Sequence, residues 1–341
     1  MNITNSSDFL LIPSEDMKTD FSRILIRYGF PEDKAKMCAA ILTDNSLDGV
    51  YSHGVNRFAR LIENVRNGYV KPRQFAACKS SVGNIEQWDG KGGVGPINAH
   101  LCTERVMHLA SQYGIGCVAL ANTNHWYRGG TYGWLSAKAG FVFIGWSNTI
   151  ANMPPWGAVD PKLGNNPLVI AVPYGREAIV LDMAMSKYSY GALESHQLKG
   201  EKLGVAGGYD LSGNLSTDPA AISESQRTLP IGYWKGSGLS LLLDILGTVL
   251  SGGLSTAEIT KQGSEYNVSQ VFIAIDIKRL ANFKSLGFVI DQIISDYHHA
   301  IPVDPNKKVR YPGEQVLKTR AQNIALGIPV HKDVWKKITQ L

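Results

Sequence analysis

The chain has 341 residues, more than one hydrophobic core usually supports, so two or more packed regions are expected. Hydrophobic residues make up 44% and charged residues 18%. The formal net charge is only +5, with Lys and Arg scattered along the chain, which argues against nucleic acid as a partner. The most apolar stretch, residues 239–250, contains Asp244 and is too short to span a bilayer, so no membrane partner is expected either.

Hydrophobic periodicity predicts alternating helices and strands in chain order. Residues 15–69 are predicted to be helical, with Pro31-Glu32-Asp33 starting the second helix. The later elements are a helix over 97–113, a buried strand over 115–121, a helix over 131–138, strands over 141–146, 167–173 and 178–183, a buried helix over 239–250, a strand over 270–277, and helices from about 285 onward. Residues 174–177 read as a hairpin between two of these strands, and residues 200–227 as a long irregular segment, which in a compact domain is often functional.

Because several neighbouring strands are joined without a crossover helix, we predict an α/β fold with a mixed sheet. Residues 1–75 are expected to form a helical region that packs with the C-terminal helices of 313–341. Residues 76–312 are expected to form a mixed α/β region. The four cysteines, Cys38, Cys78, Cys102 and Cys117, lack Cys-x-x-Cys spacing. They are predicted to be buried reduced thiols of a cytoplasmic protein, without a disulfide or a zinc site.

The segment Tyr51-Ser52-His53-Gly54-Val55-Asn56-Arg57-Phe58 holds the most informative pair of side chains. On a helix, His53 and Arg57 would point in the same direction, with Ser52 as N-cap. A guanidinium can hold a carboxylate through two hydrogen bonds, and an imidazole can give a proton to a carbonyl oxygen near neutral pH. Taken alone, such a pair on a polar helix face is more often solvated surface.

A second cluster, Asn124-His125-Trp126-Tyr127-Arg128-Gly129-Gly130, follows the predicted strand over 115–121. His125 would therefore emerge at the C-terminal end of a strand, where open α/β sheets tend to bind ligands.

The segment Gly90-Lys91-Gly92-Gly93-Val94-Gly95 matches the dinucleotide fingerprint Gly-x-Gly-x-x-Gly. Its context argues against that function. Residues 84–89 do not read as a buried parallel strand, and Pro96 removes one N–H group from the helix start that would face a pyrophosphate. A Rossmann site is therefore not predicted here.

Five blocks together resemble the type-2 malate/L-lactate dehydrogenase family: residues 51–58, 124–134 (NHWYRGGTYGW), 153–157 (MPPWG), 232–238 (GYWKGSG) and 312–314 (PGE). They follow the family's order from about residue 15 to the C-terminus. The resemblance implies a non-Rossmann, mixed-sheet fold that binds a nicotinamide cofactor, and a homodimer. It also implies cofactor contacts at Ala178, Ile179, Val180, Leu181, Asp182, Met183, Ala184, Trp234, Lys235, Gly313, Glu314 and Gln315.

Asp182 bears on the choice of cofactor. At the end of an apolar run, its carboxylate could accept hydrogen bonds from a ribose diol and would repel a 2′-phosphate, which favours NADH over NADPH. The alternative is a carboxylate that caps a turn or pairs with a nearby base. Lys235 could neutralise the pyrophosphate. Ser147 and Asn148, with residues 153–157, could line the nicotinamide pocket, although Pro154-Pro155-Trp156 could equally be a rigid packing turn.

The resemblance implies reduction of a 2-oxo acid, with 2,3-diketo-L-gulonate converted to 3-dehydro-L-gulonate as the first expectation. His53 is the expected proton donor, Arg57 the carboxylate clamp, and Ser52 and His125 position the remaining oxygens. Family members that use the histidine of the Asn-His block leave the reverse assignment open. No metal is expected, because an imidazolium and a guanidinium can offset the charges. Malate, lactate, ureidoglycolate or a cyclic imine acid remain alternative substrates, and a non-catalytic protein that binds a small anion is the second alternative.

Overall fold

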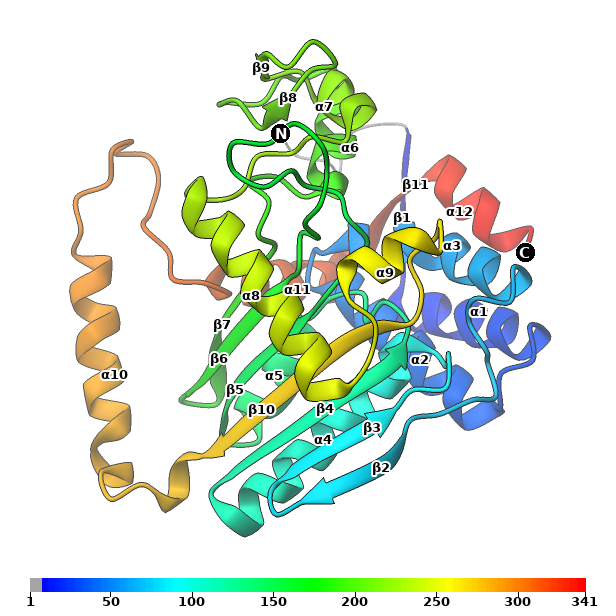
Figure 1. Ribbon diagram of the computed structural model, residues 1–341. Coiled ribbons are helices and arrows are strands. Elements are labelled where there is room, and N and C mark those ends of the chain that lie inside the picture. Colours follow the sequence, from blue (N-terminus) through cyan, green and yellow to red (C-terminus); the bar gives the residue numbers. More distant parts are fainter. Residues whose placement is uncertain (1–7) are drawn as a thin grey trace.

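The computed structural model describes residues 8–341, so residues 1–7 of the predicted helical region lie outside it. Seven strands form one mixed sheet, in which the only parallel pair among the described strands is β3 with β4 (Figure 1). The mixed-sheet prediction is confirmed. In spatial order the strands are β2 (Ala77–Val82), β3 (Ile85–Asp89), β4 (Ile115–Thr123), β10 (Val268–Asp276), β5 (Phe141–Ser147), β6 (Leu168–Tyr174) and β7 (Glu177–Met183).

Helices cover both faces of this sheet (Figure 1). One face packs on α4 (Gly95–Tyr113) and α5 (Gly130–Lys138) through Val118, Phe143 and Phe272. The other face packs on α8 (Trp234–Ser251), which is followed by α9 (Thr256–Lys261). None of the described helices is long and apolar enough to cross a membrane.

The prediction that residues 239–250 form a buried helix is wrong in two respects. Helix α8 already begins at Trp234, so the glycines at 236 and 238 lie in its first two turns. Only the side that carries Gly236, Ser240, Leu243 and Gly247 is turned to the interior, because these small residues let the helix approach the sheet. The opposite side is open, with Leu242 at 55% and Val249 at 67% exposure.

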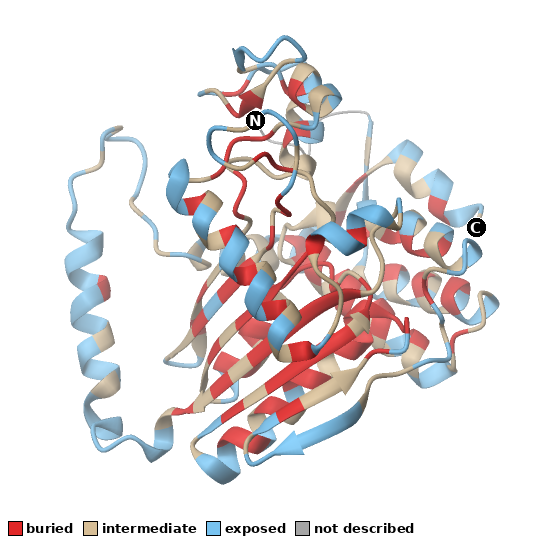
Figure 2. Ribbon diagram, in the orientation of Figure 1, coloured by how far each residue is buried: buried red, intermediate tan, exposed pale blue. Residues whose placement is uncertain are grey.

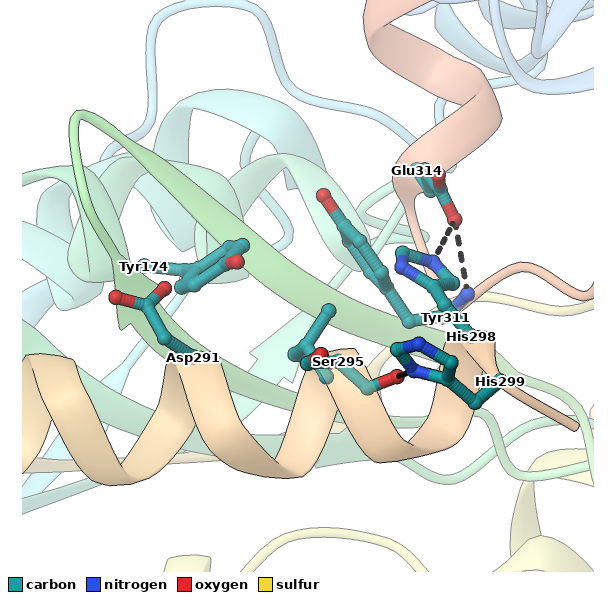
Figure 3. Close-up of a pocket in the computed structure, with 8 residues that line it drawn as sticks. Tyr174, Asp291, Ser295, His298, His299, Tyr311 and Glu314 are labelled. Carbon is teal, nitrogen blue, oxygen red and sulfur yellow. Dashed lines mark hydrogen bonds and ion pairs between the residues drawn. The ribbon is translucent and has the colours of Figure 1, made fainter.

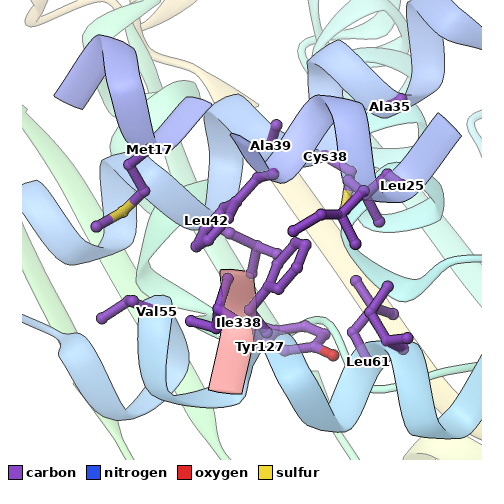
Figure 4. Close-up of a cluster of buried hydrophobic side chains, with 14 of the residues drawn as sticks. Met17, Leu25, Ala35, Cys38, Ala39, Leu42, Val55, Leu61, Tyr127 and Ile338 are labelled. Atoms are coloured by element: carbon purple, nitrogen blue, oxygen red, sulfur yellow. The ribbon is translucent and has the colours of Figure 1, made fainter. Parts of the chain in front are cut away.

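The first helices form a separate hydrophobic core together with the end of the chain (Figure 4). It contains side chains from α1 (Ser14–Arg27), α2 (Glu32–Leu47) and α3 (Val55–Arg66), and also from α12 (Lys332–Thr339). Strand β1 (Phe9–Ile12) pairs antiparallel with β11 (Ile328–His331). As predicted, α2 begins at Glu32, directly after Pro31. Tyr127, from the second sequence cluster, also lies in this core.

Two parts of the chain stand away from these cores. Residues 190–225 contain α6 (Tyr190–Leu198), two short strands, β8 (Gly208–Tyr209) and β9 (Leu215–Ser216), and α7 (Pro219–Ser225) around a small cluster of Leu193, Leu203 and Ile222. The segment predicted to be irregular thus holds short elements. Helix α10 (Phe283–His298) projects from the body, and its only buried residue is Ile294 (Figures 1 and 2). It is followed by α11 (Glu314–Leu326).

The structure corrects the interpretation of residues 84–95. Residues 85–89 form β3, which is parallel to β4, whereas no such strand was predicted. The polar Glu86 misled the prediction because its buried carboxylate is paired with Arg105 of α4 at 2.6 Å. The glycines that follow are needed for packing. A Cβ on Gly93 would lie 2.2 Å from the carbonyl oxygen of Gln74, and one on Gly95 would lie 2.1 Å from that of His125.

The cysteines are all free thiols, as predicted. Cys38 and Cys102 are buried, but Cys78 is exposed on β2, which contradicts the prediction that all four are buried.

Candidate active site

His53 lies in a tight turn before α3, and not on the helix itself. Residues Tyr51–His53 form one turn of 3₁₀-helix, and α3 starts at Val55 after Gly54. A Cβ on Gly54 would lie 2.2 Å from the Oγ of Ser46, so the turn packs tightly against α2. The predicted N-cap role of Ser52 is wrong, because Gly54 is the N-cap of α3 and the N–H of Val55 donates to the Oγ of Ser46 at 2.9 Å. The Oγ of Ser52 lies 2.9 Å from the Nδ1 of His53 instead.

His125 follows β4, as predicted, and its ring is held in one orientation. The backbone N–H of Tyr127 donates a hydrogen bond of 2.8 Å to its Nδ1. Tyr127 has a φ of +69°, and its ring packs edge-on against the imidazole at a centroid distance of 5.6 Å. Because a backbone N–H can only donate, Nδ1 must act as an acceptor, and the neutral ring carries its proton on Nε2.

The two imidazoles face each other with ring centroids 6.0 Å apart and planes inclined by 25°. Burial lowers the pKa of His53 to about 3, with further lowering by His125, Arg57 and Arg128. Burial also lowers the pKa of His125 to about 3, and Arg57 and Arg60 act in the same direction. Both rings are therefore neutral at neutral pH in the free protein.

Arg57 and Arg60 supply the positive charge of this site from successive turns of α3. Neither guanidinium forms an ion pair or a hydrogen bond with another described residue. Arg57 is half-buried and acts on the pKa of both histidines, so it lies close to both rings. A half-buried guanidinium that forms no ion pair, next to two neutral imidazoles, is suited to an anionic ligand.

One residue at this site was missed in the sequence. Glu265, in the loop before β10, accepts a hydrogen bond of 3.2 Å from the N–H of Ile150 and faces the same two arginines. No spacing or motif marks it, since a single glutamate in a polar loop is ordinary. Only the tertiary fold brings it to α3.

Behind the histidines, a network of partly buried ion pairs holds the segment that carries His125. Arg128 pairs with Asp48 of α2, and Arg320 of α11 pairs with the same aspartate at 2.7 Å and with Asp44 at 2.8 Å. Breaking one partner of a buried pair is costly, because the other charge is left without compensation. The network therefore joins three distant parts of the chain directly behind the site.

The segments predicted to contact a cofactor lie next to one another. Strand β7 carries Ala178, Ile179, Val180, Leu181, Asp182 and Met183, and Ala184 follows it. The N–H of Val180 donates to the carbonyl of Pro312 at 3.1 Å, and Gly313, with φ of +92°, lies directly against Val180. After Ala184, the N–H of Ile231 donates to Met185 at 2.8 Å, which brings Trp234 and Lys235 towards the end of β7.

Asp182 is exposed at the end of β7, and its Oδ2 accepts a hydrogen bond of 2.8 Å from the N–H of Gly130. The protein atoms packed around this carboxyl reduce its hydration and raise its pKa, while Arg128 and the N–H of Gly130 lower it. The carboxylate thus caps the start of α5 beside a base, which is the alternative considered above. Its Oδ1 forms no hydrogen bond with a described residue, so the interaction with a ribose stays a prediction.

Comparison with known proteins identifies the family. Residues 12–339 match the family described as Malate/L-lactate dehydrogenase. The chain belongs to this family. It is 46% identical over 96% of its length to the 2,3-diketo-L-gulonate reductase of Mannheimia succiniciproducens, and 45% identical over the same share to that of Pasteurella multocida; in each case 98% of the relative is covered.

Solved structures agree with this assignment. The malate dehydrogenase of Pyrococcus horikoshii OT3 is 27% identical, with a TM-score of 0.88 over 98% of this chain and 95% of that chain. A putative malate/lactate dehydrogenase from E. coli is 26% identical, with a TM-score of 0.90 over 96% and 93%. The protein is therefore an oxidoreductase acting on hydroxy or keto acids, in a family that typically uses a nicotinamide cofactor.

In this family member, the side chain of Glu314 is turned away from β7. Its Oε2 accepts a hydrogen bond of 3.1 Å from the N–H of Tyr311 and lies 3.1 Å from the Nε2 of His298 on α10 (Figure 3). These groups line an open pocket of about 410 Å³ that contains neither His53 nor His125. The amide of Gln315 donates to the hydroxyl of Thr319 at 3.5 Å.

The polar residues after β5 have structural partners. The amide of Asn148 donates to Asp244 and to Leu254, and its oxygen accepts from the N–H of Ser269, so it has no free group for a nicotinamide pocket. The hydroxyl of Ser147 donates to the carbonyl of Asn148. Both side chains hold the loop together, and their place beside a nicotinamide stays a prediction. Among residues 8–341 no cluster of histidines, cysteines and carboxylates could hold a metal ion.

Proposed function

We propose that the protein uses NADH to reduce the keto group of a 2-oxo acid, with 2,3-diketo-L-gulonate converted to 3-dehydro-L-gulonate as the reaction that fits best. The proposal rests on one observation: two neutral imidazoles, with ring centroids 6.0 Å apart, lie beside an arginine that forms no ion pair with a described residue. The names of relatives at 43–46% identity support this choice of substrate. We also place the reaction in the cytoplasm, where NADH is available.

We assign the proton donor to His53. The Nδ1 of His125 accepts from a backbone N–H, so protonating that nitrogen would turn two N–H groups towards each other. The Nδ1 of His53 faces a hydroxyl instead, and the Ser52 hydroxyl can rotate to donate to it or to accept from it. His53 can therefore gain and lose a proton without breaking a fixed contact, whereas His125 serves as a neutral donor through Nε2.

Arg57 would hold the substrate carboxylate in a bidentate pair. Since Arg57 lowers the pKa of His53, an anion bound to Arg57 offsets part of that effect and raises the pKa of the acid. Substrate binding and protonation of His53 are thus coupled. His125 would donate from Nε2 to the keto oxygen and so stabilise the negative charge that develops there.

The cofactor would lie along the end of β7. The residues there fit a dinucleotide chemically. Trp234 offers an exposed indole, Lys235 offers a cation that forms no ion pair, and the Oδ1 of Asp182 can accept a hydrogen bond. Glycine at 313 leaves the backbone open beside Val180. The chemistry that a nicotinamide supplies when bound is hydride transfer to the keto carbon. The charge of Asp182 favours NADH over NADPH.

We further propose that the protein is a homodimer formed through α8 and α10. Both helices expose large apolar side chains, including Phe288 at 66% and Ile293 at 61% on α10. Helix α10 has a single buried residue, and exposed apolar side chains gathered on one helix mark an interface. A second copy is the occupant that a symmetric self-association supplies.

The test is a substrate panel with the purified protein. Oxidation of NADH should be fastest with 2,3-diketo-L-gulonate, and slower with oxaloacetate, pyruvate or a cyclic imine acid. Faster reduction of another member of the panel would replace the substrate but keep the chemistry. If the protein binds these acids without oxidising NADH or NADPH, it is a binding protein for small anions and the proposal is refuted.

A further inference from the structure

Glu265 is a charged side chain at the site to which the reaction proposed above gives no role. It lies in the loop between α9 and β10, which packs on the segment that follows α3. The ring of the neighbouring Tyr266 stacks on Tyr69 with centroids 4.8 Å apart and planes inclined by 9°. The carbonyl of Tyr69 accepts a hydrogen bond of 3.1 Å from Asn124, next to His125.

The carboxylate has one occupied and one open oxygen. Oε2 accepts the hydrogen bond from Ile150, while Oε1 has no partner among the residues that the structure describes. Burial raises the pKa of this carboxyl, while the N–H of Ile150 and the charges of Arg57 and Arg60 lower it. The same two guanidinium groups act on His125, so Glu265 and the histidines lie around one pair of cations.

Counting charges shows what this arrangement selects. In the free protein the two arginines contribute two positive charges, Glu265 as a carboxylate contributes one negative charge, and both histidines are neutral. The proton that His53 takes up with the substrate passes to the keto oxygen. One positive charge is left for a ligand. A monocarboxylate satisfies it, whereas a dicarboxylate would bring its second negative group to Glu265 at a cost in free energy. The open Oε1 can accept only from a donor, such as a hydroxyl group.

We propose that Glu265 is a specificity-determining residue, which selects hydroxylated 2-oxo monocarboxylates and rejects 2-oxo dicarboxylates. The inference rests on the proposed function and narrows its substrate class. It explains why a family named for malate can contain a member whose site disfavours a dicarboxylate. Repulsion of the wrong substrate and a hydrogen bond to the right one act here through the same carboxylate.

The experiment compares kcat/KM for 2,3-diketo-L-gulonate and for oxaloacetate in the wild type, Glu265→Gln and Glu265→Asp. We expect Glu265→Gln to shift the ratio towards oxaloacetate by roughly tenfold or more, because the amide keeps the size but not the charge. Glu265→Asp keeps the charge and should retain most of the preference. Glu224→Gln, which removes an exposed charge on α7, is the matched control and should leave the ratio unchanged.

A purely structural role, in which Glu265 only holds the loop at Ile150, predicts equal losses with both substrates. An unchanged ratio in Glu265→Gln would therefore overturn the inference. If Glu265→Gln fails to fold, a loss of the preference in Glu265→Asp would overturn it as well, and retention would support it. A wild type that reduces no 2-oxo acid at all would instead refute the proposed function, so the two failures can be told apart.

Discussion

Replacing each histidine separately by glutamine tests which imidazole donates the proton. Glutamine has a similar size and can still form hydrogen bonds, but it cannot deliver a proton. In His53→Gln the general acid is lost, whereas in His125→Gln only a neutral hydrogen-bond donor is lost. The fixed contact between Tyr127 and His125 and the free hydroxyl beside His53 are the reasons for this difference.

The expected magnitudes differ enough to be separated. Loss of a general acid lowers kcat by roughly 10²- to 10⁴-fold. Loss of one neutral hydrogen bond costs about 0.5–1.5 kcal/mol, which corresponds to roughly 2- to 10-fold in rate. We therefore expect a large fall of kcat in His53→Gln, and a smaller fall with a raised KM in His125→Gln. Affinity for NADH should be nearly unchanged in both.

The assay is steady-state oxidation of NADH as a function of pH, with cofactor binding measured separately. Because the pKa of His53 in the free protein is about 3, a proton must be taken up with the substrate. In the wild type and in His125→Gln, kcat/KM for reduction should then fall as the pH rises. His53→Gln should lose this dependence. If His125→Gln loses both turnover and the pH dependence while His53→Gln keeps them, the roles are reversed and the reasoning from the ring contacts is wrong.

Three further predictions concern binding and stability. Arg57→Ala should raise KM for the keto acid roughly 30-fold or more, since truncating one partner of a buried charge pair costs about 2–5 kcal/mol, and equal weakening of NADH binding would contradict the assignment. Asp182→Ser should narrow the preference for NADH over NADPH, measured as the ratio of the two kcat/KM values, and a wild type that prefers NADPH would refute the role of this carboxylate. The histidine pair should also make the protein sensitive to acid. A histidine in the unfolded chain has a pKa of about 6.5, whereas the pKa of His53 and of His125 in the folded protein is about 3. The free energy of unfolding is therefore highest above pH of about 6.5 and falls as the pH drops towards about 3, because only the unfolded chain binds the proton. At pH 5, each of the two histidines lowers the free energy of unfolding by up to about 2 kcal/mol. Denaturant unfolding at pH 7 and pH 5 should show a smaller loss for His125→Gln than for the wild type, and an equal loss would count against the low pKa.

The sequence predicted elements whose signal is local. Apolar periodicity located the helices from α1 to α5 and five of the seven strands of the mixed sheet within a few residues, because each of these elements buries one continuous face. Strand β3 was missed because the polar residue Glu86 interrupts its apolar pattern. The carboxylate can be buried only because Arg105, on a helix later in the chain, pairs with it. The outer face of α8 was predicted to be buried because its residues are apolar. An apolar run does not show whether the same chain or another molecule covers it.

At the site, the pairing of His53 with Arg57 was predicted through a helix that in fact starts only after Gly54. The two residues still lie close, because a 3₁₀ turn followed by an α-helix covers nearly the same short distance. Glu265 and the orientation of His125 were out of reach. Both depend on backbone contacts, to Ile150 and within residues 125–127, that leave no pattern of residue types.

The pairing of β1 with β11 has a consequence for how the protein is made. The helices on either side of His53 leave the ribosome well before Ile328, Val330 and Ile338, which complete their core. Until then α1, α2 and α3 have an unfinished hydrophobic face that other chains can contact. We expect nascent chains to rely on chaperones until release, and a deletion of only the last fourteen or so residues to leave the mixed sheet able to form while the histidine turn has no stable support.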